Sequence, residues 1–255
     1  MRLTVVGSSD AFNAAGRGHS CFLLEGDGIG PLMIDFGATA LAALKRLGRI
    51  PDELEGVAVT HLHGDHIGGL PFLLIELMFN AVRTRPLSFV GPVGTQAATV
   101  SGLREAYRDL ADFAKPYPVE VQELAPGEEG SLAGATVRAF AADHMDPPDQ
   151  PLCLQVRTSG GTTIAFSGDS TMSDGLLQAA DGADLLVAEC SCVQPPCGRH
   201  CTWQDWLRVL PTLDVPRVLF THLNAEVRER SADLLSQAPP GKQLQFADDG
   251  LVLDL

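Results

Sequence analysis

The feature that most constrains this chain is a group of metal-ligand side chains directly after an apolar run. Residues 57–60 are apolar and mostly β-branched, and they predict a buried strand. The next six residues, 61–66, contain three histidines and an aspartate, whereas the whole chain of 255 residues has only 7 histidines. A solvated polar turn is the alternative, but it does not explain this crowding. Ligands gathered past a strand end therefore predict an active site that binds metal.

Side-chain alternation divides these ligands between two directions. In an extended segment, His61 and His63 point to the same side. Gly64 then allows the chain to turn, so that Asp65 and His66 point elsewhere. Three imidazoles and a carboxylate arranged in this way favour two borderline metal ions over one.

Length and charge limit the class of protein. A chain of 255 residues can form one large domain or two small ones, and 45% hydrophobic residues supply a sizeable core. The formal net charge of −14 argues against a general electrostatic grip on nucleic acid or an anionic membrane. Bound divalent ions would nevertheless reverse the field locally.

No targeting or membrane-spanning segment is evident. The apolar run 3–6 ends at Gly7 and is too short for a signal peptide. The most apolar long stretch, 67–82, is interrupted by Pro71 and Glu76. We therefore expect a cytoplasmic protein without membrane contact, whose six cysteines are thiols and not disulfides.

Strand-like and helix-like segments alternate along the whole chain. The expected strands are 3–7, 21–25, 32–36, 57–60, 87–90, 119–124, 136–141, 152–158, 162–166, 185–188, 218–220 and 251–253. The expected helices are 39–47, 71–82, 95–113, 174–180, 203–210 and 225–236. This alternation fits either a doubly wound sheet or a layered sandwich.

Two expected hairpins distinguish these architectures. Residues 21–36 and 152–166 each contain two strands around a glycine-rich turn, which argues against a simple parallel sheet. Each hairpin is followed by a short acidic turn, at 35–37 and 168–170, and then by a helix. We therefore expect two similar layers packed face to face.

Further ligand-type residues follow other expected strands. Asp143 and His144 come after 136–141, Asp169 comes after 162–166, and His222 follows 218–220. One such residue alone is usually a turn residue. Because strand ends at one sheet edge converge, their joint occurrence with the hexapeptide predicts a shared site.

The order of these residues resembles that of the metallo-β-lactamase superfamily. The pattern is His-x-His-x-Asp-His, then a histidine, then Gly-Asp-Ser, then Thr-His. The resemblance extends from Gly18-His19-Ser20 to Thr221-His222-Leu223, nearly the whole chain. It implies an α/β fold, namely a four-layer αββα sandwich, formed by a single hydrolase domain over residues 1–255.

The resemblance also implies two divalent metal ions, and this chain retains all seven ligands. By position, the first ion would take His61, His63 and His144, the second would take Asp65, His66 and His222, and Asp169 would bridge them. Two Zn²⁺ ions roughly 3.5–4 Å apart can share a hydroxide that attacks the substrate. The ligand types also allow Mn²⁺ or Fe. Asp65 thereby counts among the catalytic residues.

A second pair of motifs resembles the ribonuclease Z-like branch of this superfamily. There, a glutamate after a strand and a later His-x-Thr assist phosphodiester cleavage, which implies catalytic roles for Glu189 and His200. His200 would protonate the leaving oxygen and Glu189 would orient it. Thr202-x-x-Asp205 predicts a capping box that opens the helix 203–210, although Glu or Gln is more usual at its end. His200 would then lie just outside a helix N-terminus, which favours phosphate; a surface-loop histidine is the alternative.

Two smaller features stay open at this stage. His19 matches a common position of the same branch, and we expect it near the site as a structural or substrate-side group. Four cysteines lie within twelve residues, namely Cys190, Cys192, Cys197 and Cys201. They are candidate ligands of a second, structural zinc site. Their spacing is not that of a familiar zinc knuckle, so we favour a loop with ordinary thiols.

The expected reaction is hydrolysis of a small nucleotide-like or cyclic phosphodiester. Members that process the 3′ end of tRNA carry a long inserted arm, and the region 113–152 has no evident basic, glycine-rich arm. Nucleic acid is therefore an unlikely partner. The alternatives are hydrolysis of a thioester, lactone or other carboxyl ester, a tRNA 3′-processing endoribonuclease, and a non-hydrolytic metal-dependent carrier or sensor. The sequence leaves open whether the chain forms a homodimer.

Overall fold

The computed structural model describes residues 1–113 and 115–255, and in these residues two mixed β-sheets pack face to face. The first sheet has the order β14 (Val252–Asp254), β1 (Arg2–Gly7), β2 (Cys21–Gly26), β3 (Ile29–Ile34), β4 (Gly56–Ala58), β5 (Leu87–Pro92) and β6 (Val119–Leu124). The second has the order β13 (Gln243–Phe246), β12 (Arg217–Thr221), β11 (Leu185–Glu189), β10 (Thr163–Phe166), β9 (Leu152–Arg157), β8 (Ala135–Ala141) and β7 (Glu129–Leu132).

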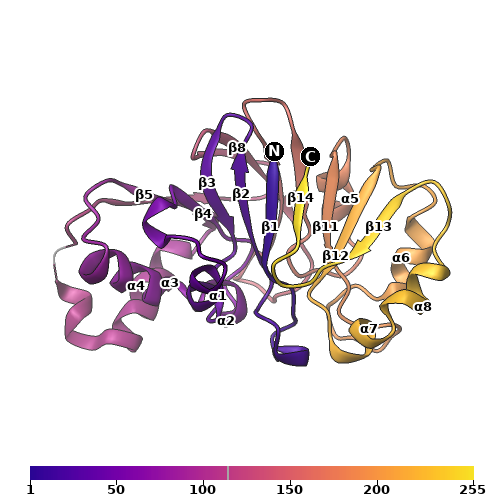
Figure 1. Cartoon of the computed structure of the whole chain (residues 1–255), viewed down its shortest axis with the longest axis horizontal. Helices are drawn as coiled ribbons and strands as arrows, with labels where there is room; N and C mark the ends of the chain where they lie inside the picture. The colour runs from indigo at the N-terminus through magenta and orange to yellow at the C-terminus, as the bar shows by residue number, and fades with distance from the viewer. Residues whose placement is uncertain (114) are drawn as a thin grey trace.

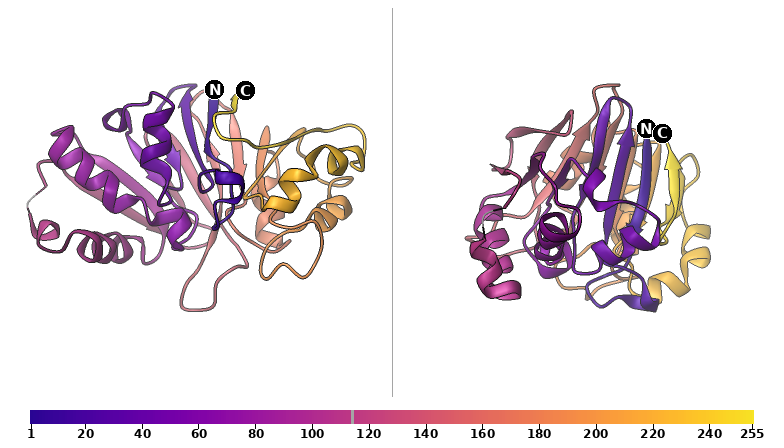
Figure 2. Two further views of the ribbon diagram at one scale, coloured as in Figure 1. Left: turned by 60° about the horizontal axis from the view of Figure 1, so that its bottom comes forward. Right: turned by 60° about the vertical axis from the view of Figure 1, so that its left-hand side comes forward.

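Helices cover the outer faces of both sheets, which gives the four-layer αββα sandwich expected from the sequence (Figure 1). The α-helices are α1 (Ala40–Arg46), α2 (Gly64–Ile67), α3 (Leu70–Ile75), α4 (Thr95–Tyr107), α5 (Asp174–Ala180), α6 (Trp203–Val209), α7 (Ala225–Glu229) and α8 (Ser231–Ser236). The other helical segments are η1 (Ala14–Gly16), η2 (Pro51–Glu53), η3 (Glu76–Asn80) and η4 (Arg108–Asp112). Figure 2 shows the same layers from two further directions.

The two sheets are built alike. Strands β1, β2 and β3 are antiparallel, whereas β3 to β6 are parallel; likewise β7 to β10 are antiparallel and β10 to β13 are parallel. The antiparallel pairs include both hairpins predicted from the sequence, β2–β3 and β9–β10. Asp27, with φ 56°, turns the first hairpin between two glycines that also have positive φ. The expectation of two similar face-to-face layers is confirmed.

Several element boundaries differ from the sequence prediction. Strands β7 and β13 are missing from it because both are short edge strands with alternating exposure and few apolar residues. The helix predicted over 95–113 breaks at Arg108, whose φ is 47°, and the one predicted over 225–236 is two helices. The four-residue helix α2 was predicted only as a turn at Gly64. Local periodicity does not report such breaks.

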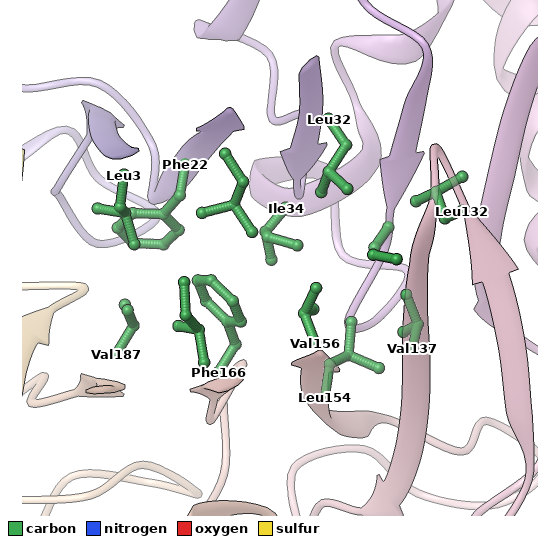
Figure 3. Close-up of a cluster of buried hydrophobic side chains, with 14 of the residues drawn as sticks. Leu3, Phe22, Leu32, Ile34, Leu132, Val137, Leu154, Val156, Phe166 and Val187 are labelled. Atoms are coloured by element: carbon green, nitrogen blue, oxygen red, sulfur yellow. The ribbon is translucent and has the colours of Figure 1, made fainter. Parts of the chain in front are cut away.

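A central apolar core holds the two sheets together. Phe22 of β2 and Phe166 of β10 meet across the interface, with ring centroids 5.7 Å apart. Around them pack buried aliphatic side chains from both sheets, as Figure 3 shows. Two further cores fill the spaces between each sheet and its helices. Three cores therefore separate four layers, and the sheets act as a rigid support for the residues at their ends.

Both termini lie together at one end of the sandwich, opposite α2 and α7 (Figure 1). Strand β14 pairs with β1, and the Met1 amine donates to the carbonyl of Leu255. The loops at the opposite end carry the histidines and aspartates singled out in the sequence. In the part of the chain that the structure describes, no helix has the length and apolar character to cross a membrane.

We predict that Phe166→Ala lowers the free energy of unfolding by about 3–5 kcal/mol, because it removes a side chain that is 2% exposed between two rigid sheets. Chemical denaturation measures this loss, and the dependence of the unfolding free energy on denaturant concentration should be unchanged. Val100→Ala, at a position 52% exposed on α4, is the control and should change stability by less than about 0.5 kcal/mol. Equal effects of the two substitutions would contradict this account of the core.

Candidate metal centre

The hexapeptide follows β4 and runs into the short helix α2. His61 and His63 precede α2, with His63 at its N-cap, and Asp65 and His66 lie within it. The helical turn, which the sequence analysis read only as a bend at Gly64, rotates Asp65 and His66 away from the first two ligands. The predicted division into two directions is therefore observed, and a helix is its cause.

The first group of ligands consists of His61, His63 and His144. The Nδ1 atom of His63 lies 3.2 Å from Nε2 of His61 and 3.0 Å from Nε2 of His144. His144 follows β8 of the second sheet, so the group joins both sheets. Three imidazole nitrogens that converge in this way present lone pairs to a common point, as a cation requires.

The second group consists of Asp65, His66, Asp169 and His222, with one ligand atom of each within 4.8 Å of the others. Asp65 Oδ2 lies 3.3 Å from Nε2 of His66 and 3.4 Å from Nε2 of His222. His222 follows β12 and has φ 55°, a left-handed conformation that its neighbours must maintain.

Asp169 lies between the two groups. Its Oδ2 atom is 3.8 Å from Nε2 of His61 and 3.7 Å from Nε2 of His144. The same oxygen is 3.3 Å from Nε2 of His222, in the second group. Gly168, with φ 55°, turns the chain sharply after β10 and directs Asp169 back into the cluster. All seven residues predicted as ligands are thus brought together; their assignment to two ions stays a prediction.

The cluster fits bound cations on two independent observations. Nε2 of His66 and Oδ1 of Asp169 are buried without any hydrogen-bond partner among the residues described. Such atoms are costly to bury unless something else coordinates them. The second observation is the convergence of three imidazole nitrogens in the first group. A metal bound to these atoms would satisfy all of them.

Outer hydrogen bonds fix which nitrogen each histidine presents. His61 Nδ1 lies 3.1 Å from Thr60 Oγ1, and the Thr60 hydroxyl donates to Asp35. His66 Nδ1 donates directly to Asp35 Oδ2 over 2.7 Å. The buried carboxylate of Asp35 therefore orients one histidine from each group, so that both Nε2 atoms face the cluster.

The second sheet provides a matching arrangement. His222 Nδ1 donates to Ser191 Oγ over 2.8 Å, and the Ser191 hydroxyl donates to Glu189 Oε2 over 2.7 Å. His144 Nδ1 donates to the backbone carbonyl of Arg199 over 3.0 Å. Asp35 and Glu189 are 3% and 0% exposed, and each supports ligands from behind.

Sequence reasoning did not identify Asp35, Thr60 or Ser191 as site residues. The acidic turn 35–37 was visible after the first hairpin, and its counterpart at 168–170 contains a predicted ligand. That parallel was the available signal for Asp35. No comparable signal marks Thr60 or Ser191, because their roles depend on hydrogen bonds between segments that are distant in sequence.

The two groups of ligands differ in how their surroundings shift the pKa values of their histidines. Burial holds the pKa of His61 well below its usual value, and it lowers that of His144 as well. Burial also opposes protonation of His66, but Asp169 and Asp35 raise its pKa well above the usual value. For Asp169, burial favours the neutral acid, yet His222 and His66 hold its pKa well below its usual range. The carboxylates thus attract positive charge to the second group, either protons or metal ions.

Glu189 and His200 form the pair expected from the sequence. His200 Nδ1 lies 3.1 Å from Glu189 Oε1, and also 3.9 Å from Asp169 Oδ2. Burial disfavours the imidazolium, but the hydrogen bond and negative charge of Glu189 raise the pKa of His200 to about 9. The predicted capping box is present, since Thr202 and Asp205 bond reciprocally at the start of α6.

His19 belongs to the loop that joins β1 and β2. It is 8% exposed, its Nδ1 atom is buried without a hydrogen-bond partner among the described residues, and it is close enough to Asp65 to feel its charge. Burial lowers the pKa of His19 despite that charge. It lies near the site, as expected, and the choice between a structural and a substrate-side role stays open.

The prediction that all six cysteines are thiols is wrong for Cys192 and Cys197, which form a disulfide with Cα atoms 6.1 Å apart. The turn between them, 193–196, brings them together, and spacing alone did not reveal it. The remaining four are free and buried: Cys21, Cys153, Cys190 and Cys201. Among the residues described, no cysteine belongs to a group of candidate metal ligands. The structural zinc site considered from the sequence is thus not formed.

A pocket of about 400 Å³ opens over the cluster. The ligands His63, Asp65, His144, Asp169 and His222 line its floor, together with His200. The rest of its wall comes from the loop at 10–12, from Asn224, and from the segment that carries the disulfide. This volume suits a small molecule.

The fold and the cluster define a metallo-hydrolase of the metallo-β-lactamase fold, of the ribonuclease Z-like branch. More specifically, the chain belongs to the Anti-Pycsar protein Apyc1 family, whose model matches residues 1–237.

Individual relatives agree with this placement. The chain is 29% identical over 196 residues to a ribonuclease Z of Mycobacterium bovis (strain BCG / Pasteur 1173P2), which covers 73% of this chain and 69% of the relative. Its fold is similar to that of the metallo-β-lactamase fold protein YhfI from Bacillus subtilis, with a TM-score of 0.77, 20% identity and 99% of each chain covered. It is also similar to human tRNase Z, short form, with a TM-score of 0.76, 21% identity, and 100% and 99% of the two chains covered.

We predict that the purified protein, denatured without reductant, contains four titratable thiols and that reduction raises the number to six. Thiol titration and the intact mass before and after alkylation measure this. Cys192→Ser is the matched variant, since it releases Cys197 and should give five thiols without reductant. Six thiols in the unreduced wild type would contradict the disulfide.

A second prediction concerns His200 in the metal-free protein. Its imidazole should stay protonated up to about pH 9, and Glu189→Gln should lower that pKa because the partner charge is lost. A histidine pKa raised above the unfolded value of about 6.5 stabilises the fold fully below pH 6.5, and this contribution is lost as pH rises through 9. NMR titration of the ring nitrogens measures the pKa. A value unchanged by Glu189→Gln would show that the pair does not control it.

Proposed function

We propose that this protein is a dinuclear metal-dependent phosphodiesterase that acts on a small nucleotide-like or cyclic diester. The observation that carries the proposal is the position of His200, held by Glu189 in the same pocket as the seven candidate ligands. An imidazole that can deliver a proton beside a metal cluster suits a substrate that is itself anionic and that releases an alkoxide. Two Zn²⁺ ions are the proposed cofactors, and the donor types also accept Mn²⁺ or Fe.

Each charged residue at the site has a distinct proposed role in the reaction. Divalent ions, when bound, supply Lewis acidity and activation of water. The carboxylates of Asp65 and Asp169 hold cationic charge at the floor of the pocket. His200, whose Nδ1 is engaged by Glu189, has Nε2 free to donate a proton to the leaving oxygen. Glu189 acts through His200 and, by way of Ser191, also supports the ligand His222.

Several observations favour a small substrate over tRNA. Much of the region 113–152, where a tRNA-binding arm would be inserted, forms β6, β7 and β8, which are strands of the sandwich itself. Ala114 lies outside the residues described. Arg83 is buried and donates to the backbone carbonyls of Asp52 and Pro86, so it is not available to bind RNA. The net charge of −14 also opposes RNA binding. The pocket volume of about 400 Å³ is sufficient for one nucleotide.

The proposal predicts hydrolysis of bis-p-nitrophenyl phosphate by the metal-loaded protein, with two metal ions per chain by elemental mass spectrometry. On a diester with an alkoxide leaving group, such as a cyclic nucleotide, His200→Ala should lower kcat by about 10²–10⁴-fold while the metal content stays the same, because only proton transfer is lost. Hydrolysis of bis-p-nitrophenyl phosphate should be much less affected, because p-nitrophenolate leaves without protonation. Gln204→Ala, an exposed position on α6, is the matched control and should retain wild-type activity.

Three results would contradict this proposal. Turnover of a thioester or lactone without any phosphodiester turnover would favour a carboxyl ester hydrolase. Unchanged activity of His200→Ala on the diester with the alkoxide leaving group would remove the role given to that residue. Tight binding of a small molecule without turnover of any ester would favour a carrier or sensor.

A further inference from the structure

Phe12 is the most exposed large hydrophobic side chain in the described part of the protein. It is 88% exposed, whereas the next most exposed, Val82, is 63% exposed. It lies in the loop between β1 and β2 and lines the pocket above the ligand cluster. An aromatic ring exposed at the wall of the pocket is available to stack on a ligand that enters it.

The loop holds Phe12 in place. The Oδ1 atom of Asp10 accepts hydrogen bonds from Ser9 Oγ and from the backbone amides of Phe12 and Ala14, at 3.0–3.2 Å. The Asn13 side chain donates to the carbonyl of Arg17 over 2.9 Å. Asn13 itself has φ 55°, a conformation that such bonds must support. Because the loop is already ordered, a ligand that stacks on Phe12 loses little affinity to ordering it.

The loop is also fixed relative to the candidate metal ligands. Ser9 forms a parallel bridge with Leu223, the residue after His222. Ser9 also bridges to His19 within the loop, and the Ser20 hydroxyl donates to the carbonyl of Ser9 over 3.1 Å. The backbone of the loop that carries Phe12 is therefore tied to the segment that carries His222.

The wall of the pocket is polar at the floor and apolar at the rim. The floor carries histidines and carboxylates, whereas Ala11 and Phe12 contribute hydrocarbon at the mouth. Among the described residues that line it, none is a lysine or an arginine, and the carboxylate of Asp10 stands beside Ala11 and Phe12, so this part of the wall is poorly suited to a second anionic group. The complementary molecule has an anionic diester at one end and a flat, uncharged ring at the other.

We propose that Phe12 is the platform on which the base of a nucleotide substrate stacks. This inference rests on the proposed phosphodiesterase function and adds the group that selects nucleotides among diesters. Stacking of a base on an aromatic side chain contributes roughly tenfold to a hundredfold in affinity. It tolerates different bases, because every base presents a π-face.

The first test compares two cyclic diesters, a cyclic nucleoside monophosphate and the cyclic ribose phosphate that lacks the base. Phe12→Ala should raise KM for the nucleotide by about tenfold or more and leave kcat within twofold, with no change for the base-free diester. Phe12→Tyr should restore KM, and Phe12→Leu, apolar but not planar, should not. Phe79→Ala, which removes another exposed ring, is the control. Equal loss on both diesters, or full rescue by Phe12→Leu, would overturn the inference.

The second test does not depend on turnover. Trp203 and Trp206 are 1% and 0% exposed, so Phe12→Trp introduces an exposed fluorophore at the rim. In the metal-loaded protein, a nucleoside monophosphate should quench its emission, and ribose phosphate should not. Absence of quenching would overturn the stacking role. If neither cyclic diester is hydrolysed while quenching persists, the phosphodiesterase function fails and the base-binding platform stands.

Discussion

The organisation of this protein depends on the placement of Asp169, a carboxylate 3% exposed and surrounded by imidazoles from both sheets. A buried carboxylate is stable only where positive charge compensates it. The nearest sources are protons on His66 and His222 or cations held by the whole cluster. The two sheets must therefore meet at this edge with their loops in register, and the core around Phe22 and Phe166 provides that alignment.

Two further buried carboxylates make the cluster rigid. Asp35, after the first sheet's β3, reaches His66 directly and His61 through the Thr60 hydroxyl. Glu189, in the second sheet, reaches His222 through the Ser191 hydroxyl. The arrangement follows from the similar construction of the sheets, since both residues stand at the end of a central strand. Glu189 differs in one respect, because it also binds His200. The second sheet therefore supports the ligands and, in addition, presents an ionisable group to the substrate pocket.

The residues that were predictable from the sequence are those whose role follows from local pattern. His61, Asp169 and His222 each come directly after an apolar strand, and glycine turns marked both hairpins. The rest depends on contacts between distant segments. Thr60 and Ser191 are ordinary polar residues until their partners are known, and the Cys192–Cys197 disulfide depends on a turn that spacing does not reveal. Strand β13 was missed because an edge strand buries too little apolar surface to show its period.

The same distinction separates the chemistry of the site from its selectivity. Ligands at strand ends are positioned by sheets whose fold persists at 20% identity, as the likeness to YhfI shows. The loop that carries Phe12 and the segment that carries His200 are positioned by their own side-chain hydrogen bonds, through Asp10 in one case and Glu189 in the other. Such loops can change without disturbing the cores beneath them. Substrate choice should therefore be sought in the contacts of Asp10 and Glu189, because the ligand cluster would serve many hydrolytic reactions equally well.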